Sequence, residues 1–372
     1  MKFSCARDVL SDALAPVLSV VPSKSTLPIL SHVCMTTDHT KKQLHLAATD
    51  LDLSLSSVID LQVDKSGSIT VPARTLAELV RELPEGNVNL EVIGGRLEIR
   101  FKQGHHIIAG TPAEEFPSLA QVNRNKAIRV PATDLLRMIR KTMFAVSKDE
   151  TRPALNGVLW ETQGDAMVMV ATDGHRLAKI ERPNKKLAGL GGDLIVPPKI
   201  LDLLVKYAKD DQEIGVIFGE NHVIFDLGKM VLTSRLIEGP YPNYRQVIPT
   251  ESAKRFTVDT GELFSTVRRV SILSNSLTHQ VKFTLSPGAV QLSAANADLG
   301  AEAKENLDGE YTGDPMDVGY NAAYVLDILK QMDSERVQMN LNTSASAAVL
   351  KPLEQNKEEN YLCLIMPLRL SE

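Results

Sequence analysis

The segment Met167-Val-Met-Val-Ala-Thr-Asp173 is one of three related stretches in this sequence, and their spacing decides the fold. Apolar residues alternate along it and a small polar turn follows, which is typical of a β-strand that enters a hairpin. The pattern occurs again as Leu44-His-Leu-Ala-Ala-Thr-Asp50 and Val290-Gln-Leu-Ser-Ala-Ala-Asn296. The segments end at positions 50, 173 and 296, so the offset is 123 residues both times. This spacing indicates an internal repeat.

Two further landmarks repeat at nearly the same distance. Val-Pro or Val-Gly pairs that begin a helical pattern start at residues 71, 196 and 318, with offsets of 125 and 122. An amphipathic helix pattern surrounds Leu10, Leu135 and Leu263, with offsets of 125 and 128. One third of the 372 residues is 124, so the landmarks divide the chain into three equal parts. We therefore expect three tandem domains of similar plan, at residues 1–122, 123–250 and 251–372, although a coincidence of generic α+β units is an alternative.

Each repeat alternates between helical and strand periods in the same order. The first helix of the second repeat shows one apolar stripe at three- and four-residue spacing, with Thr133 and Asp134 as its N-cap. The stripe consists of Leu135, Leu136, Ile139, Met143 and Val146. Short strands such as residues 194–196 and 223–225 follow, and a second helix comes after a Val-Pro pair. The sequence predicts an α+β fold with two helices per domain packed on antiparallel sheets.

Composition limits the functional classes. The chain is 43% hydrophobic and 23% charged, as in globular proteins, and no stretch has the roughly 20 apolar residues of a membrane span. Three widely spaced cysteines favour neither disulfides nor a zinc site, and the N-terminus is unlike a signal peptide, so we expect a cytoplasmic protein without metal or cofactor. The net charge of −5 argues against indiscriminate nucleic-acid binding but leaves room for a local basic stripe.

Six short motifs, in order along the whole chain, resemble the bacterial DNA polymerase III β subunit family, the sliding clamps. The most specific motif is Val170-Ala-Thr-Asp-Gly-His-Arg-Leu177. The others are Thr26-Leu-Pro-Ile-Leu30, Arg152-Pro-Ala-Leu-Asn-Gly157, Tyr241-Pro-Asn-Tyr-Arg245, Ile272-Leu-Ser-Asn275 and Met366-Pro-Leu-Arg-Leu370. The resemblance implies a DNA clamp fold and a head-to-tail homodimeric ring that encircles double-stranded DNA. It also implies a non-catalytic processivity factor that tethers the replicative polymerase to its template.

Helix dimensions agree with a dimer. Neighbouring helices pack about 8–10 Å apart and are themselves about 10–12 Å wide, so the six helices of one chain would enclose no bore. Twelve helices would form a circle of about 96–120 Å and leave a bore of roughly 20 Å. A ring wide enough for a duplex therefore requires two chains.

The resemblance also implies a hydrophobic pocket between the second and third domains that binds short peptides. Its expected partners are the DNA polymerase III α subunit, the clamp loader δ subunit, and other DNA polymerases and repair proteins. Arginine and histidine side chains would orient the peptide and apolar side chains would bind it. The implied residues are Leu155, Thr172, Gly174, His175, Arg176, Leu177, Pro242, Val247, Ser346, Met366, Pro367 and Arg369. Without the resemblance, the apolar members would be read as ordinary core.

Basic residues on or beside the predicted helices are candidates for contacts with DNA phosphates. Sequence-independent phosphate attraction suits a sliding ring, because base contacts would stop it. The candidates are Lys24, Arg137, Arg140, Lys141, Lys148 and Lys199. Solvated helix faces explain such residues equally well without the resemblance. The resemblance further implies a dimer seam at Ile272 and Leu273, which would face a strand that runs through His106, Ile107 and Ile108.

Two other functions remain open. Asp173 and His175 could belong to a metal-assisted hydrolase, although the sequence has no phosphate loop, nucleophile elbow or zinc-binding HExxH motif. The second alternative is a monomeric peptide-binding scaffold that never encircles DNA.

Overall fold

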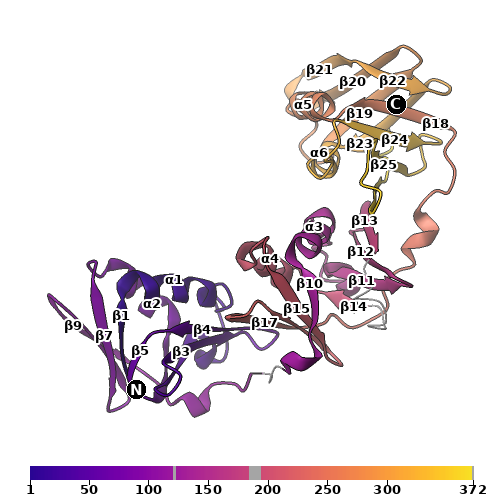
Figure 1. The fold of residues 1–372 in the computed structure, drawn as a ribbon. Coiled ribbons are helices and arrows are strands. Elements are labelled where there is room, and N and C mark those ends of the chain that lie inside the picture. The colour runs from indigo at the N-terminus through magenta and orange to yellow at the C-terminus, as the bar shows by residue number, and fades with distance from the viewer. Residues whose placement is uncertain (120–122, 184–193, 371–372) are drawn as a thin grey trace. The chain divides into compact units, whose positions relative to one another are not determined.

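The computed structural model describes residues 1–119, 123–183 and 194–370. Its helices and strands make an α+β fold, with two α-helices in each predicted domain (Figure 1). The helices of the described residues are α1 (Arg7–Leu18), α2 (Ala73–Glu82), α3 (Ala132–Met143), α4 (Pro198–Tyr207), α5 (Thr260–Ser271) and α6 (Ala322–Leu329). None of them is long and apolar enough to cross a membrane.

The described chain forms two compact units. One contains Met1–Asp134 and Lys199–Leu236, and the other contains Leu135–Pro198 and Ile237–Glu372. All strand pairs named below are antiparallel, as predicted. The division into units falls inside the second predicted domain, because two of the sheets continue from one predicted domain into the next.

The first unit contains two sheets. The five-stranded sheet has the order β5 (Gln62–Lys65), β1 (Lys2–Ala6), β7 (Asn87–Ile93), β8 (Arg96–Phe101) and β9 (Gly104–Ala109). The eight-stranded sheet has the order β10 (Ile128–Pro131), β15 (Glu213–Phe218), β16 (His222–Asp226), β17 (Met230–Arg235), β4 (Leu53–Asp60), β3 (Gln43–Thr49), β2 (His32–Asp38) and β6 (Gly67–Pro72).

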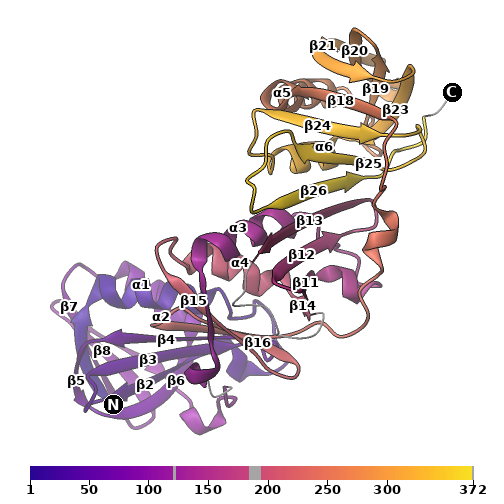
Figure 2. The same cartoon turned by 45° about the vertical axis from the view of Figure 1, so that its right-hand side comes forward.

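The second unit also contains two sheets, and Figure 2 shows the run from β24 to β13 in the larger one. The nine-stranded sheet has the order β14 (Leu194–Val196), β11 (Val158–Gln163), β12 (Ala166–Thr172), β13 (Arg176–Pro183), β26 (Asn360–Ile365), β25 (Ala348–Pro352), β24 (Arg336–Leu341), β18 (Lys254–Asp259) and β22 (Gly309–Thr312). The four-stranded sheet has the order β21 (Ala301–Leu307), β20 (Ala289–Asn296), β19 (Gln280–Ser286) and β23 (Met316–Asn321).

Apolar periodicity explains how the helices pack on these sheets. Leu10, Leu14 and Val17 recur at helical spacing in α1 and are buried where the helix contacts β3 and β4. α1 lies beside α2, and α5 lies beside α6 (Figure 1). Leu44 and Leu46 alternate with half-buried residues along β3, as in a strand with one face in the core. The repeated landmarks therefore correspond to repeated helix and strand units.

The predicted strands at residues 194–196 and 223–225 are present as β14 and within β16. The first helix of the second repeat differs slightly from its prediction. α3 begins at Ala132, so Thr133 and Asp134 lie in its first turn and not at the N-cap position, and it ends at Met143, before Val146. Positions 121 and 122, at the first predicted domain boundary, lie outside the described residues.

Candidate functional site

The turn between β12 and β13 is held by its own side chains. Thr172 Oγ1 donates to the Arg176 carbonyl oxygen at 2.6 Å and accepts from the Gly174 N–H at 3.1 Å. Asp173 Oδ1 accepts from the backbone N–H groups of His175 and Arg176, both at 2.9 Å. Because these side chains satisfy the backbone groups of the turn, the sequence from residue 172 to residue 176 specifies one local conformation.

Glycine is the favoured residue at position 174, the tip of this turn. Its φ of 91° lies in the left-handed region, which a residue without a Cβ atom adopts at no steric cost. A Cβ atom at this position would also lie 3.0 Å from Nη1 of Arg152. Nη2 of Arg152 donates to the Asp173 carbonyl oxygen at 3.2 Å. The glycine thus allows the Arg152 side chain to close over the turn.

The Arg176 guanidinium connects the turn to two other segments. Nε donates to Asp173 Oδ2 at 3.1 Å, Nη1 donates to Asp327 Oδ2 at 2.8 Å, and Nη2 donates to the Phe144 carbonyl oxygen at 2.9 Å. Cζ of Arg176 also lies 4.5 Å from the centre of the Tyr324 ring, a cation–π distance. The side chain is only 10% exposed. Arg176 therefore holds the turn in place from inside the protein. The expectation that its guanidinium orients a peptide group is not supported.

Asp173 and His175 are not arranged as a catalytic pair. The Asp173 carboxylate accepts hydrogen bonds from two backbone N–H groups and from Arg176, and the exposed His175 ring is stacked with the Tyr324 ring at a centroid distance of 6.3 Å. The described residues contain no group of three or more His, Cys, Asp or Glu side chains that could bind a metal ion. The hydrolase alternative has no geometric support.

The apolar residues predicted for the pocket are of two kinds. Leu155 and Leu177 are 5% and 1% exposed, so they form the floor and are part of the core. Leu177 packs in one cluster with Leu364 of β26 and Tyr244, which follows the loop from β17. Val247 and Met366 are 53% and 40% exposed, and Gly174, His175, Pro242 and Arg369 are also exposed. We use the name His175 surface for five of these exposed residues, Gly174, His175, Pro242, Val247 and Met366.

The C-terminal segment adds one side of the His175 surface. The Met366 N–H donates to the His175 carbonyl oxygen at 2.8 Å, and the Leu368 N–H donates to the Gly319 carbonyl oxygen at 2.8 Å. Pro367 lies half-buried between these two bonds. Ser346 is half-buried, and its hydroxyl closes a local turn with Thr343. The structure therefore brings residues from three distant parts of the sequence onto one core cluster.

A cavity of about 410 Å³ lies beside this surface on the loop of residues 241–246. Of the predicted pocket residues it includes Pro242, and its other walls are Leu159, Glu161 and the loop itself. The buried Glu161 carboxylate accepts from the Tyr244 hydroxyl and from Nη2 of Arg245, both at 2.7 Å. Burial, followed by the bond to Glu161, raises the pKa of Tyr244. The loop is thus fixed next to the predicted pocket by bonds from Tyr244 and the exposed Arg245 to the buried Glu161 carboxylate.

Arg137 and Lys141, two of the predicted DNA contacts, are bound to carboxylates of the third predicted domain. Nε and Nη2 of Arg137 bind the Glu359 carboxylate at 2.6 and 3.0 Å. The Lys141 side chain is 4% exposed, and its Nζ lies 2.8 Å from Asp333 Oδ2. Burial lowers the pKa of Lys141, and the hydrogen bond to Asp333 opposes this. These contacts attach α3 to the loops of residues 330–360, and they do not support phosphate binding by Arg137 or Lys141.

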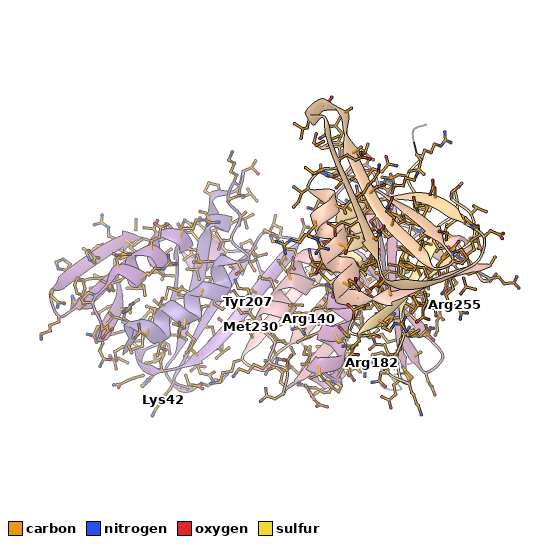
Figure 3. All side chains as sticks on the ribbon, turned by 90° about the horizontal axis from the view of Figure 1, so that it is seen from above. Lys42, Arg140, Arg182, Tyr207, Met230 and Arg255 are labelled. Carbon is orange, nitrogen blue, oxygen red and sulfur yellow. The ribbon has the colours of Figure 1, made fainter. Side chains whose placement is uncertain are left out.

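The other four predicted DNA contacts are exposed. Lys24 lies in the loop after α1, Lys148 lies in the loop after α3, and Arg140 projects from α3 (Figure 3). Lys199 near the start of α4 is 52% exposed and is paired with Asp50. These cations are accessible to a phosphate backbone, which requires accessibility and not a built pocket.

Three adjoining segments of the chain match the three domains of one protein family. The matches are the N-terminal domain of the DNA polymerase III beta subunit at residues 1–120, the central domain at 129–243 and the C-terminal domain at 245–369. The chain belongs to the DNA polymerase III beta subunit family. The prediction of three domains with the DNA clamp fold is confirmed, whereas the boundaries after residues 122 and 250 stay predictions.

Members of the beta subunit family are similar to this chain over their whole length. A protein of Caulobacter vibrioides named beta sliding clamp is 35% identical, with 100% of both chains covered. A beta sliding clamp of a Synechocystis species is 33% identical, again with 100% of both covered. The crystal structure of the DNA polymerase III subunit beta from Pseudomonas aeruginosa has a TM-score of 0.92 and 31% identity over 100% of both chains. A second structure of that protein contains griselimycin.

The residues that the beta subunit family implies for a dimer seam lie at sheet edges and at a helix end. Ile272 follows α5 and is 74% exposed, and Leu273 is half-buried. β9 is an edge strand whose His106 is exposed and stacks on Phe101 at 5.2 Å. Ile108 is already buried within its own chain at 9% exposure, whereas its neighbour Ile107 is 54% exposed. Ile107 lies between His106 and Ile108 on the strand that was predicted to face the seam.

Sequence reasoning missed Tyr324 and Asp327 on α6. Both contact the turn of residues 172–176, through the His175 ring and the Arg176 guanidinium. Their positions in the third repeat correspond to an ordinary amphipathic helix, and no local pattern in the sequence signals a contact some 150 residues away. The pairing of β13 with β26 brings the two repeats together.

Proposed function

We propose that this chain is a sliding clamp that closes with a second copy into a head-to-tail ring around double-stranded DNA. It hydrolyses nothing itself and acts as a processivity subunit. The DNA polymerase III α subunit, the clamp loader δ subunit, other DNA polymerases and repair proteins would bind the His175 surface through short peptides. Family membership supports this proposal, and the pairing of strands at the domain junctions is the observation that argues for the ring.

In each repeat, four antiparallel strands lie side by side, and one row of directly paired residues runs across them. Each row starts at a position seven residues before the landmark leucine of its repeat. The rows are Phe3–Leu90–Ile99–His106, Ile128–Val216–Phe225–Leu232 and Phe256–Met339–Leu350–Cys363. The last position of the row is therefore occupied by equivalent residues in the three repeats, which are His106, Leu232 and Cys363.

At each junction, the partner of this last position lies on the second strand of a hairpin whose first strand is one of the repeated segments. Ala48 pairs with Leu55, Ala171 with Ala178, and Ala294 with Ala303. Within the chain, Leu55 pairs with Leu232 and Ala178 pairs with Cys363. The remaining two equivalents are His106 on β9 and Ala303 on β21, both on edge strands. The repeat predicts that His106 pairs with Ala303 of a second copy, because an unpaired strand edge is a template for such pairing.

Cysteine cross-linking tests this register. In the double variant His106→Cys, Ala303→Cys, directly opposite residues of an antiparallel pair would bring the Cβ atoms to about 4.5–5.5 Å, near disulfide distance. We expect oxidation to yield a covalent species of twice 40.7 kDa. In the control His105→Cys, Ala303→Cys, the two thiols point to opposite faces of the sheet and should not cross-link.

Light scattering over a range of protein concentrations provides an independent measurement. A dimer that is weakened by the double variant Ile272→Ala, Leu273→Ala agrees with the proposed seam. A monomer at every concentration, or equal cross-linking of the matched pair and the control, would contradict the ring and leave the monomeric peptide-binding scaffold as the better account.

A further inference from the structure

The first domain contains a turn that matches the turn of the His175 surface bond for bond. Thr49 Oγ1 donates to the Leu53 carbonyl oxygen at 3.1 Å and accepts from the Leu51 N–H at 3.0 Å. Asp50 Oδ1 accepts from the N–H groups of Asp52 and Leu53 at 3.1 and 2.7 Å. Each of these residues lies 123 positions before its counterpart in the turn of residues 172–176.

One residue of the two turns differs in a way that is energetically unfavourable. Leu51 has a φ of 82°, close to the 91° of Gly174, its counterpart in the second domain. A bulky residue with a Cβ atom is strained in this region, where glycine is not. The Leu51 side chain is nevertheless 51% exposed, so its burial within the chain does not offset the strain. Strain of this kind occurs mostly at functional sites.

Leu51 lines a cavity of about 340 Å³ that lies entirely in the first compact unit. The half-buried Pro117 and Leu119 provide further apolar lining, and His222 and Arg235 also line the cavity. Pro117 is followed by the end of the first domain, as Pro242 is followed by the end of the second. We call this cavity the Leu51 pocket. By the repeat, it occupies the position that the His175 surface occupies one domain later.

Arg235 is the cation that lines the Leu51 pocket, and Asp52 is the carboxylate. Nη1 of Arg235 lies 3.9 Å from Asp52, and both side chains are exposed, at 69% and 77%, so this pair is weak. The Asp50 carboxylate is already paired with Lys199. Arg235 can therefore bind a carboxylate in two-point fashion, with the half-buried His222 ring as a second polar partner.

We propose that the Leu51 pocket is a second peptide-binding site of this chain. It binds an extended peptide in which an aliphatic side chain packs on Leu51, Pro117 and Leu119 and an adjacent carboxylate pairs with Arg235. The proposal rests on the proposed function, because it takes peptide binding at the His175 surface as its pattern. One chain then holds two peptides on different domains.

Photo-cross-linking of the full-length protein distinguishes the two sites. The probe is the capped peptide Ac-Gly-Leu-Asp-Leu-Phe-Gly-NH2, with a diazirine analogue in place of the leucine before the aspartate. Mass spectrometry then locates the labelled residues. We expect labels in residues 49–54 or 117–119 and, separately, in residues 172–177 or 366–369.

Leu51→Gly removes the apolar wall and relieves the backbone strain, so the variant folds. We expect it to lower labelling of the Leu51 pocket about tenfold, equivalent to about 1.4 kcal/mol, and to leave labelling at the His175 surface unchanged. Arg235→Gln should have a similar effect, and replacement of the probe aspartate by asparagine should mimic it.

The outcomes separate this inference from the proposed function. Labels at the His175 surface alone, or labelling of the Leu51 pocket that Leu51→Gly does not reduce, would overturn the second site and leave the proposed function standing. Labels at the Leu51 pocket alone would support the second site and contradict peptide binding at the His175 surface. No labels at either place would contradict both.

Discussion

The Arg176 guanidinium joins three segments that are far apart in the sequence. It bonds to Asp173 in its own turn, to the end of α3 and to α6. Five N–H groups in a rigid fork allow this, whereas a lysine could not reach the same three acceptors. The wall of the proposed peptide site is therefore held in shape by residues that a bound peptide need not touch.

Replacement of Gly174 by alanine should destabilise the fold by about 1–2 kcal/mol, because an alanine in the left-handed region is strained and its Cβ atom would approach Arg152. Urea unfolding measures the change. Gly261→Ala in the first turn of α5 is the matched control, and it should stabilise the protein slightly because alanine is the better helix residue. Equal effects of the two variants would contradict the conformational argument.

Asp327 should contribute to the pH dependence of stability. Burial alone would raise the pKa of Asp327, but hydrogen bonds from Arg176 and Lys330 outweigh it, and the pKa lies below its usual value. The unfolded chain therefore takes up a proton at higher pH than the folded chain. The contribution is complete above about pH 4 and is lost as the pH falls through the folded-state pKa.

We expect Asp327→Asn to cost about 1 kcal/mol at pH 7, since the carboxylate is partly exposed and solvent screens it. The difference from the unmodified protein should shrink as urea unfolding is repeated towards pH 3. Asp308→Asn, at an exposed position, serves as the control. A difference that stays constant from pH 7 to pH 3 would show that the ion pair does not cause it.

At the scale of elements, the domain junctions are strand pairs. β17 pairs with β4 at the first junction, and β13 pairs with β26 at the second. Leu177 and Leu364 are opposite each other in the second pair and both are buried. The junction is therefore built like the interior of a domain, and a cavity there should destabilise the protein as it would in any core.

Leu364→Ala should cost about 2–5 kcal/mol, the usual range for a buried leucine, and urea unfolding again measures it. The matched control is Leu353→Ala, at a leucine that is 41% exposed, and it should change stability by less than about 1 kcal/mol. A small effect of Leu364→Ala would mean that the two sheets relax independently at the junction.

The repeated segments predicted β3, β12 and β20 because alternation and turn residues are local signals. Whether an edge strand continues into the sheet of the next domain depends on hydrogen bonds between residues more than 100 positions apart, which no local pattern shows. The same limit explains why the sequence predicted DNA contacts at Arg137 and Lys141. A basic residue on a helix looks alike in sequence whether it faces solvent or pairs with Glu359 and Asp333. At the turn of residues 172–176, the family motifs supplied information that local patterns do not contain.

At the scale of the whole molecule, a chain of net charge −5 should be held on DNA by enclosure more than by attraction. After loading on a nicked circular duplex by a clamp loader with ATP, we expect the protein to stay bound at about 0.5 M salt, where surface charges are strongly screened. Cutting the circle should release it. Release from intact circles at the same rate would contradict enclosure.

The exposed cations should affect how quickly the ring and DNA associate. Lys24→Glu combined with Lys148→Glu should slow loading about tenfold at low salt, with a smaller effect at high salt. Lys41→Glu combined with Lys42→Glu makes the same change in charge on the hairpin between β2 and β3, where Lys42 is marked in Figure 3, and should have little effect. Equal slowing by the two pairs would indicate that net charge alone matters.

The continuous sheets also have a mechanical consequence. Five backbone pairs join β17 to β4 and six join β13 to β26, and each pair lies in the interior of a larger sheet. A pulling force along such strands loads all of these pairs in parallel, so neither junction yields until several bonds break together. Under tension, each junction should therefore yield in one cooperative step.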